Sequence, residues 1–300
     1  MNAGHEICGM GYYFALPFIY LLSLLPMRAV YAVSDFMYIV VFYGLKYRRT
    51  VTETNLRNAF PEKSEQEIQA ITKTYFHYLC DLMLETFKTL TISEKEALRR
   101  CKFHDTSLFN RLHEEKKSII IVLGHLGNWE WAGASMTLDT DYQLYVIYHP
   151  LKDKNFDRLI YKMRTRFGTK LIPMKNTLRD MIKNKAEISA TAFIADQTPS
   201  TPANAYWTTF LNQDTPVFEG TEKVATMMKY PVVFAWLKRT KRGYYEIYTE
   251  LLVDNPVGMQ YGEITEKFTR RLEDEIRAQP ETWLWSHRRW KHKRPVNENQ

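Results

Sequence analysis

Residues 117–133 constrain the fold of this chain more than any other stretch. They read KSIIIVLGHLGNWEWAG, and residues 118–123 are apolar and rich in β-branched side chains. Such a run is too short for a core helix and fits a strand that is buried on both faces. We therefore expect a buried strand here, around which the rest of the chain is organised.

Polar and conformationally special residues follow directly after this predicted strand. They are Gly124, His125, Gly127, Asn128 and Glu130. In open α/β sheets, ligand sites lie just beyond the carboxyl ends of the strands. The sequence therefore predicts a functional site in the turn that begins at Gly124.

The flanking segments alternate between helical and strand-like patterns. Ser64 and Glu67 resemble a capping box that opens a helix reaching Leu90. Strands are expected at residues 142–148, 170–173, 188–194, 231–237 and 244–252, and helices at residues 155–167, 177–185, 219–229 and 262–278. The last two strands are expected to form a β-hairpin. The alternation predicts an α/β fold with a largely parallel central sheet and flanking helices.

The N-terminal part is the most apolar region. Residues 11–27 carry no charge, but they number only 17 and include Pro17 and Pro26, whereas a membrane-spanning helix needs ~20 apolar residues. No cleavage site of a signal peptide follows. One interpretation is a membrane-embedded or interfacial helix, with Lys46, Arg48 and Arg49 at the headgroups. The other is a helical hairpin packed on the core of the domain. We predict a membrane anchor at residues 1–46 and a second domain at residues 47–300.

The charge balance and the cysteines limit the partners and the compartment. The chain has 41 Lys and Arg against 34 Asp and Glu, a net charge of +7. This excess favours an anionic partner, which could be a membrane surface, an acidic carrier protein or nucleic acid. Cys8, Cys80 and Cys101 show no C-x-x-C spacing. They argue against a disulfide framework or a cysteine-rich zinc site, and they fit a reducing, cytosol-facing compartment.

His125 and Glu130 are the first candidate catalytic pair. On an ideal helix their spacing corresponds to ~500° of rotation, so they would not share a face. They could meet if His125 lies in the turn and Glu130 in the first turn of the next helix. The carboxylate would then fix the imidazole tautomer, and the histidine could act as a general base. The alternative is that both residues belong to an ordinary helix start.

Asp196 and several basic residues are further candidates. Asp196 follows the strand at residues 188–194, so it could open onto the same edge of the sheet as His125, or it could simply cap a turn. His149 follows another strand, and Arg164 and Arg166 lie late in the next helix. Arginine suits phosphate and carboxylate groups because its guanidinium donates two parallel hydrogen bonds.

The C-terminal segment 283–295 reads WLWSHRRWKHKRP. Its basic residues could form a solvated face, but Trp283, Trp285 and Trp290 between them favour a membrane interface, where aromatic and cationic side chains gather.

Several common chemistries have no motif in this chain. There is no G-x-S-x-G, no P-loop and no H-E-x-x-H, so serine hydrolysis, nucleotide hydrolysis and zincin chemistry are not supported. A metal at His125 and Glu130 would need further ligands, and the sequence offers no clear set. No cysteine lies near these motifs, so covalent catalysis by a thiolate is not supported either.

Several segments, taken in order, resemble the bacterial lipid A late acyltransferases (lauroyl and myristoyl acyltransferases), within the lysophospholipid acyltransferase superfamily. The segments are YRRTVTETNLRNAFP (residues 47–61), GHLGNWE (124–130), PLKDKNFDRLI (150–160), RTRFG (164–168), ADQ (195–197) and WLWSHRRWK (283–291). The resemblance implies an acyltransferase domain at residues 47–300. It also implies direct acyl transfer from acyl carrier protein to a hydroxyl of a lipid A precursor at the inner membrane, on its cytoplasmic side, with no cofactor and no metal.

The resemblance also assigns roles to residues. It implies that His125 is the general base and Glu130 its partner. The expected substrate-binding residues are Asn128, His149, Arg166, Asp196 and Phe210. This chain has His149 before Pro150, where many members of the family have arginine.

Two alternatives remain at this point. The acceptor could be a lysophospholipid or an acylated amino acid lipid, because the motifs predict the reaction and say little about the acceptor. The protein could instead be a non-catalytic module that binds membranes or nucleic acid through its basic, aromatic C-terminal segment. We favour the acyltransferase, with no nucleic acid as a partner, because a binding module has no need of a histidine and a glutamate at the end of a strand.

Overall fold

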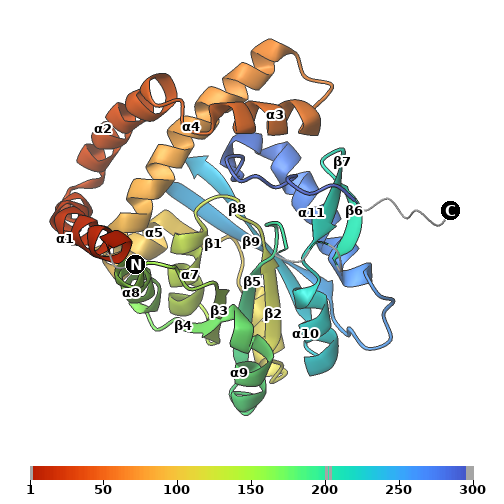
Figure 1. The fold of residues 1–300 in the computed structure, drawn as a ribbon. Coiled ribbons are helices and arrows are strands. Elements are labelled where there is room, and N and C mark those ends of the chain that lie inside the picture. Colours follow the sequence, from red (N-terminus) through yellow and green to blue (C-terminus); the bar gives the residue numbers. More distant parts are fainter. Residues whose placement is uncertain (1–2, 200–201, 203–204, 295–300) are drawn as a thin grey trace.

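The computed structural model describes residues 3–199, 202 and 205–294 (Figure 1). A seven-stranded sheet in the order β1-β9-β8-β2-β5-β3-β4 forms its centre. Its strands are β1 (Cys101–Phe103), β2 (Ile119–Leu123), β3 (Gln143–Tyr148), β4 (Lys170–Pro173), β5 (Ser189–Ile194), β8 (Val232–Lys241) and β9 (Tyr244–Val253). All neighbouring pairs are parallel except β8 and β9, which form an antiparallel hairpin. The predicted α/β class, the largely parallel sheet and the C-terminal hairpin are confirmed.

Helices cover both faces of this sheet. The longer helices are α1 (Ala3–Leu24), α2 (Met27–Tyr38), α3 (Arg49–Ala59), α4 (Glu65–Lys88), α7 (Trp129–Leu138), α8 (Lys154–Thr165), α10 (Gly220–Met228) and α11 (Glu263–Ala278). The shorter ones are η1 (Ile39–Gly44), α5 (Glu94–Arg100), α6 (Ser107–Glu114), η2 (Met174–Asn176), α9 (Thr177–Lys183) and η4 (Pro280–Thr282). In Figure 1, α7 and α8 lie on one side of the sheet, and α10 and α11 on the other.

Local signals in the sequence account for the elements next to the site. All five residues of β2 are buried, as expected for a strand between two layers of helices. The helix α4 begins with the predicted capping box, in which Ser64 and Glu67 bond each other's backbone amides. The helix α7 is capped by the Asn128 side chain, which accepts a hydrogen bond from the Trp131 amide.

A small hairpin that the sequence did not reveal lies beside α11. It consists of β6 (Tyr206–Phe210) and β7 (Gln213–Val217). Leu211 and Asn212 form its turn, and both have positive φ angles, 49° and 61°, as a type I′ turn requires. The strand β7 could not be predicted from the sequence because Pro216 interrupts the strand pattern, and within sheets proline is usual only in edge strands.

The N-terminal helices pack on α4 through buried apolar side chains such as Val30 and Phe42 and through polar contacts. Ser34 donates to Asp81, Tyr31 donates to Glu85, and the Lys88 ammonium donates to the Ser23 and Leu25 carbonyls at the end of α1. These contacts fix α1 and α2 against the rest of the chain. The structure therefore gives two helices and the π-helix η1 where the sequence suggested one anchor segment.

In the described part of the chain, none of the helices taken singly has both the length and the apolar composition needed to span a membrane. One bent pair, Met27–Gly44 with Arg49–Ala59 at 86°, reaches these values together. The division into residues 1–46 and 47–300 stays a prediction.

The aromatic C-terminal segment does not form an exposed interface. Trp283 and Trp285 are buried, and Trp290 packs against Trp283 and Phe210. The membrane-interface prediction for these tryptophans is therefore wrong. The physical reason is that η4 returns this segment across α4, where the large rings fill the core. Cys80 and Cys101 are buried free thiols, and the side chain of Cys8 lies outside the described residues.

Candidate active site

The candidate site lies where three neighbouring strands end. Because β2, β5 and β3 are adjacent and parallel, their carboxyl ends open on the same edge of the sheet. His125 follows β2, Asp196 and Gln197 follow β5, and His149 follows β3. The expectation that His125 and Asp196 share one edge of the sheet is confirmed.

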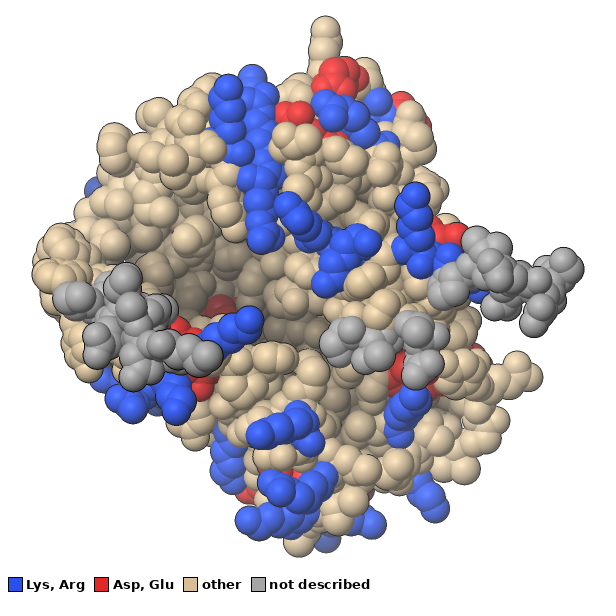
Figure 2. Space-filling model, viewed as in Figure 1, with Lys and Arg blue, Asp and Glu red and all other residues tan. Residues whose placement is uncertain are grey.

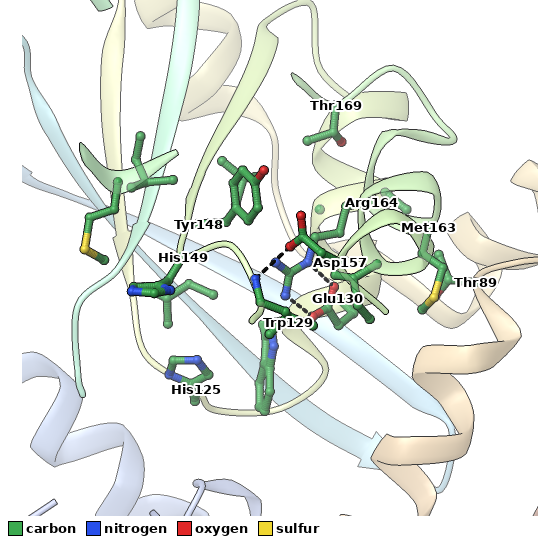
Figure 3. Close-up of a pocket in the computed structure, with 18 of the residues that line it drawn as sticks. Thr89, His125, Trp129, Glu130, Tyr148, His149, Asp157, Met163, Arg164 and Thr169 are labelled. Carbon is green, nitrogen blue, oxygen red and sulfur yellow. Dashed lines mark hydrogen bonds and ion pairs between the residues drawn. The ribbon is translucent and has the colours of Figure 1, made fainter. Parts of the chain in front are cut away.

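A cavity of about 420 Å³ lies beside these strand ends. Figure 2 shows that this face of the molecule is hollowed beside the N-terminal helices. His125, Glu130, His149 and Arg164 line the cavity (Figure 3). Its apolar wall consists mainly of Trp129, Val146, Ile147, Ile160, Met163, Phe167 and Ile194. A wall of this kind suits a ligand with a long apolar part and a polar reactive group.

Two glycines shape the turn that carries His125. A Cβ atom on Gly124 would lie 2.7 Å from the Leu272 side chain and 3.2 Å from Asp196 Oδ2. Gly127 has a φ of +65°, and a Cβ atom there would lie 2.6 Å from Leu237 Cβ. Larger residues at either position would push the turn away from α11 or β8. Glycine therefore brings the His125 backbone close to Asp196.

Asp196 holds His125 at two points. The His125 backbone amide donates to Asp196 Oδ2 at 2.8 Å, and His125 Nδ1 lies 2.6 Å from Asp196 Oδ1. The indole of Trp283 also donates to Asp196 Oδ2, at 2.8 Å. Burial alone would raise the pKa of Asp196, but the charge of protonated His125 and these hydrogen bonds outweigh burial and lower the pKa to about 2. Asp196 is therefore a carboxylate at neutral pH.

The carboxylate determines which nitrogen of His125 faces the cavity. With its proton on Nδ1, the ring donates to Asp196 and leaves Nε2 unprotonated. In this tautomer Nε2 accepts a hydrogen bond from Gln197 Nε2 at 3.3 Å, and the His125 and Trp129 rings form a T-shaped pair with a centroid distance of 4.8 Å. His125 and Gln197 both line the cavity. The arrangement can accept a proton from a ligand in the cavity.

Glu130 has a different partner. Its two carboxylate oxygens accept hydrogen bonds from Arg164 Nε at 2.9 Å and Arg164 Nη2 at 2.5 Å, and the dashed lines in Figure 3 mark this pair. Burial alone would lower the pKa of Arg164, but the charge of Glu130 and these hydrogen bonds raise it. The pair thus places a fixed guanidinium in the wall of the cavity.

The prediction that Glu130 orients His125 therefore needs correction, because Asp196 takes that place. Glu130 lies in the first turn of α7, from which it reaches α8 and Arg164. Asp196 instead comes from β5, the strand next to β2, so it reaches both the backbone and the ring of His125. In sequence, Arg164 was visible only as a basic residue near the end of α8.

A comparison with known proteins adds to this geometry. Residues 7–292 match the family model described as bacterial lipid A biosynthesis acyltransferase. A lipid A biosynthesis acyltransferase of Haemophilus influenzae is 21% identical over 281 residues, which cover 92% of this chain and 86% of that relative. The chain belongs to the bacterial lipid A biosynthesis acyltransferase family. It is an acyltransferase, so the alternative of a non-catalytic binding module is wrong.

The other predicted substrate-binding residues of this acyltransferase lie in different places. His149 lines the cavity and is exposed. Asn128 is fully buried, where its amide donates to Glu85 and its oxygen caps α7. Asn128 therefore has a structural task, because both ends of its side chain already have protein partners.

Arg166 and Phe210 lie outside the lining of the cavity. Arg166 donates to the backbone carbonyls of Thr89 and Ile92, so it ties α8 to the segment after α4. Phe210 is buried and packs against the edge of the Trp283 ring. The structure thus differs from both expectations, because α8 directs Arg164 rather than Arg166 into the cavity, and the hairpin turns Phe210 into the core.

Among the residues that the structure describes, no group of three or more histidine, cysteine, aspartate or glutamate side chains is placed to hold a metal ion. The predicted absence of a metal or cofactor stays a prediction.

Proposed function

We propose that this acyltransferase moves a fatty acyl chain from a thioester of acyl carrier protein to a hydroxyl of a lipid A precursor. The observation that carries the proposal is the His125–Asp196 pair, in which Asp196 holds Nδ1 and Nε2 remains unprotonated beside Gln197, at a cavity with a long apolar wall. The matching family and the Haemophilus influenzae relative, both named for lipid A biosynthesis, support this choice of acceptor.

In the proposed reaction His125 Nε2 takes the proton of the acceptor hydroxyl while the hydroxyl oxygen attacks the thioester carbonyl carbon. A new C–O bond forms, the C–S bond breaks, and the protonated imidazole gives its proton to the departing thiolate. One proton passes from the hydroxyl oxygen to His125 Nε2 and then to the thiolate sulfur. No atom changes its oxidation state, so the transfer needs no redox cofactor. Asp196 keeps the ring in the required tautomer and stabilises its positive charge between the two proton transfers.

Negative charge develops on the carbonyl oxygen during this attack. The backbone amides of His125 and Gly127 are engaged with Asp196 and the Thr282 carbonyl, so they are not free to stabilise it. Arg164, which Glu130 holds in the cavity wall, and the amide of Gln197 next to His125 are the proposed donors.

We further propose that the enzyme works at the cytoplasmic face of the inner membrane. Nine apolar side chains on α1, α2 and η1 or just after them have more than half of their surface exposed, namely Tyr13, Phe14, Phe18, Leu21, Leu24, Phe36, Ile39, Tyr43 and Leu45. Figure 2 shows few charged side chains over α1 and α2, beside the hollow. An apolar surface of this kind suits the boundary between headgroups and acyl chains, and it would bring the lipid acceptor to the cavity.

Acyl transfer from labelled acyl carrier protein to a lipid A precursor tests the reaction. We expect the His125→Ala variant to lose ~10²–10⁴-fold in kcat, the usual contribution of a general base. The matched control is His104→Ala, because His104 is an exposed histidine that does not line the cavity. A folded His125→Ala variant with the wild-type rate would falsify the mechanism.

The acceptor needs a separate test. Lipid A from a strain that lacks this gene should lose the mass of one acyl chain, and the wild-type gene should restore it. If lipid A is unchanged and a lysophospholipid or an acylated amino acid lipid changes instead, the acceptor in this proposal is wrong although the chemistry stands.

A further inference from the structure

Arg289 is a buried cation with too few partners. Its side chain is among the largest fully buried ones of the protein. Nη2 donates to the Pro216 carbonyl in β7 at 2.8 Å, but Nε and Nη1 are buried without a hydrogen-bond partner in the described part of the chain. Packing alone does not explain an arginine here, because methionine or leucine would fill the space without burying unpaired donors.

Arg289 and Asp196 line the same small cavity, which shares none of its lining residues with the main cavity. The other lining side chains come from the β6–β7 hairpin, from α11 and from Ala195, and they are apolar apart from Thr269, whose hydroxyl donates to the Thr265 carbonyl. Asp196 is the only carboxylate among the described residues of this lining. The cavity measures about 10 Å³, close to the space that one water molecule needs.

Asp196, which lines this small cavity, has one hydrogen-bond acceptor position left. Two carboxylate oxygens offer about four lone-pair positions, and three are taken by the His125 amide, His125 Nδ1 and the Trp283 indole. A guanidinium or a water molecule that bridges from it would complete the set. Arg289 thus has unpaired donors and a positive charge, and Asp196 has a free acceptor position and a negative charge.

We propose that Arg289 is a positioning residue that acts on the His125–Asp196 pair through the small cavity, by holding Asp196 as a carboxylate in the orientation that His125 needs. The inference rests on the proposed role of His125 as the general base. Arg289 does not line the main cavity, so its effect would reach the reaction through Asp196.

The other groups around Asp196 do not replace this cation. His125 is its partner on the side of the cavity, and the indole of Trp283 carries no charge. His287, on the same C-terminal segment as Arg289, has its pKa lowered to about 4 by burial, so it is neutral near pH 7. Burial lowers the pKa of Arg289 as well, but only to about 10, so Arg289 keeps its charge.

The test compares Arg289→Met, which removes the charge and keeps most of the volume, with Arg289→Lys, which keeps the charge. Arg288→Met is the control, because Arg288 is the exposed neighbour on the same segment. The pH profiles of kcat and kcat/KM are measured for each purified variant with acyl carrier protein thioester and lipid acceptor. Thermal unfolding shows whether each variant is folded, and Arg289→Gln serves in place of Arg289→Met if that variant does not fold.

For Arg289→Met we expect kcat to fall by about tenfold or more, a part of the ~10²–10⁴-fold effect of a general base, while KM changes little. We also expect the acidic limb of the kcat/KM profile to move to higher pH. Loss of a nearby positive charge makes the His125–Asp196 pair easier to protonate, and the protonated pair is inactive as a base. Arg289→Lys should keep the limb near its wild-type position and recover part of kcat.

Two results would overturn the inference. One is a folded Arg289→Met variant with the wild-type kcat and pH profile. The other is a loss of kcat that is equal at every pH and equal in the methionine and lysine variants, which would mean that Arg289 has only a structural role. His125→Ala in the same assay separates the two proposals, because an active His125→Ala variant contradicts the proposed function itself, whatever Arg289 does.

Discussion

At the scale of single residues, the choice of carboxylate determines what His125 can do. Asp196 contacts His125 through both of its oxygens, whereas both oxygens of Glu130 are occupied by Arg164. Glu130 lines the main cavity and Asp196 does not, and the two acids have separate partners. In the proposed mechanism Asp196 sets the tautomer of the general base, while Glu130 keeps the Arg164 guanidinium in the cavity wall.

Asp196→Asn separates these tasks. The asparagine oxygen can still accept from the His125 amide, but its NH₂ group then faces Nδ1 and donates to it. His125 is thereby forced to carry its proton on Nε2, which points into the cavity and can no longer accept one. We expect kcat to fall ~10²–10⁴-fold with the fold retained, measured by acyl transfer and by circular dichroism. Retention of the wild-type kcat would contradict the assignment of Asp196.

Gly133 leaves room in the main cavity. It lines that cavity one helical turn beyond Glu130, and a Cβ atom there would meet nothing within 4 Å. A leucine side chain would therefore occupy space that an acyl chain could use. We expect Gly133→Leu to shift transfer towards shorter acyl chains, measured by competition between acyl carrier proteins loaded with chains of different lengths.

Gly133→Ala is the matched control for that change. It should keep the chain preference and stabilise the fold by roughly 0.5–1 kcal/mol, because alanine loses less backbone freedom in a helix. The interpretation of this wall as the acyl site is wrong if Gly133→Leu folds, transfers at the wild-type rate and keeps the wild-type chain preference.

At the scale of elements, the start of α7 is fixed by a buried polar cluster. Glu85 on α4 accepts hydrogen bonds from Tyr31 on α2, Tyr245 on β9 and Asn128 at the cap of α7. Burial raises the pKa of Glu85, although these hydrogen bonds oppose the shift. The cluster connects four elements immediately behind the turn that carries His125, so it holds that turn from the protein side.

Asn128→Ala tests whether this residue is structural. Loss of the helix cap costs about 0.5–2 kcal/mol, and leaving Glu85 short of a buried partner costs about 1–3 kcal/mol more. We expect a lower midpoint of urea unfolding with an unchanged m value and an unchanged KM for the acceptor. Asn110→Ala, in an exposed position on α6, is the control. A raised KM together with wild-type stability would instead indicate that Asn128 binds the substrate.

The elements themselves could largely be predicted from the sequence, because their signals are local. The buried run of β2, the capping box of α4 and the apolar spacing of α8 are all contained in a few consecutive residues. The exceptions had weak local signals, such as β1 with three residues and β7 with Pro216 inside it.

The pairing of charged side chains could not be predicted in this way, because it depends on how elements pack. Arg164 meets Glu130 only because α8 lies against α7, and no spacing in the sequence encodes that contact. The positions of His125 and Asp196 could be predicted more easily, since both residues follow strands and the carboxyl ends of parallel strands lie at the same edge of a sheet. The sequence thus placed both residues at one edge of the sheet and assigned the wrong carboxylate to the histidine.

At the scale of the whole molecule, the N-terminal helices carry apolar side chains on their outer face as well as in the core, where Val30 and Phe42 are buried. Their polar contacts, such as Ser34 with Asp81 and Tyr31 with Glu85, face the protein, while Phe14, Phe18 and other apolar side chains face outward. In water this arrangement is unfavourable, and at a lipid surface it is favourable. The polar contacts hold α1 and α2 in place, so the exposed apolar surface of these helices keeps a fixed orientation relative to the cavity.

This orientation predicts that Phe14 and Phe18 contribute directly to membrane binding. Burying one phenylalanine side chain contributes ~1.5–3 kcal/mol, and each 1.4 kcal/mol corresponds to about tenfold in affinity. The double variant Phe14→Glu with Phe18→Glu should therefore bind vesicles of anionic and zwitterionic phospholipids at least ~10²-fold more weakly. Co-sedimentation at several salt concentrations measures this affinity. Added salt should weaken vesicle binding by the wild-type protein only in part, since apolar contacts are not screened by salt.

Met227→Glu provides the control for that experiment. Met227 is also apolar and exposed, but it lies on α10, on the opposite side of the sheet from α1 and α2 (Figure 1). A membrane that contacts the N-terminal helices leaves this residue in water, so vesicle binding should remain at the wild-type level. If both variants bind equally well, or if Met227→Glu loses as much binding as the double variant, the apolar surface of α1 and α2 does not determine how the enzyme sits on lipid.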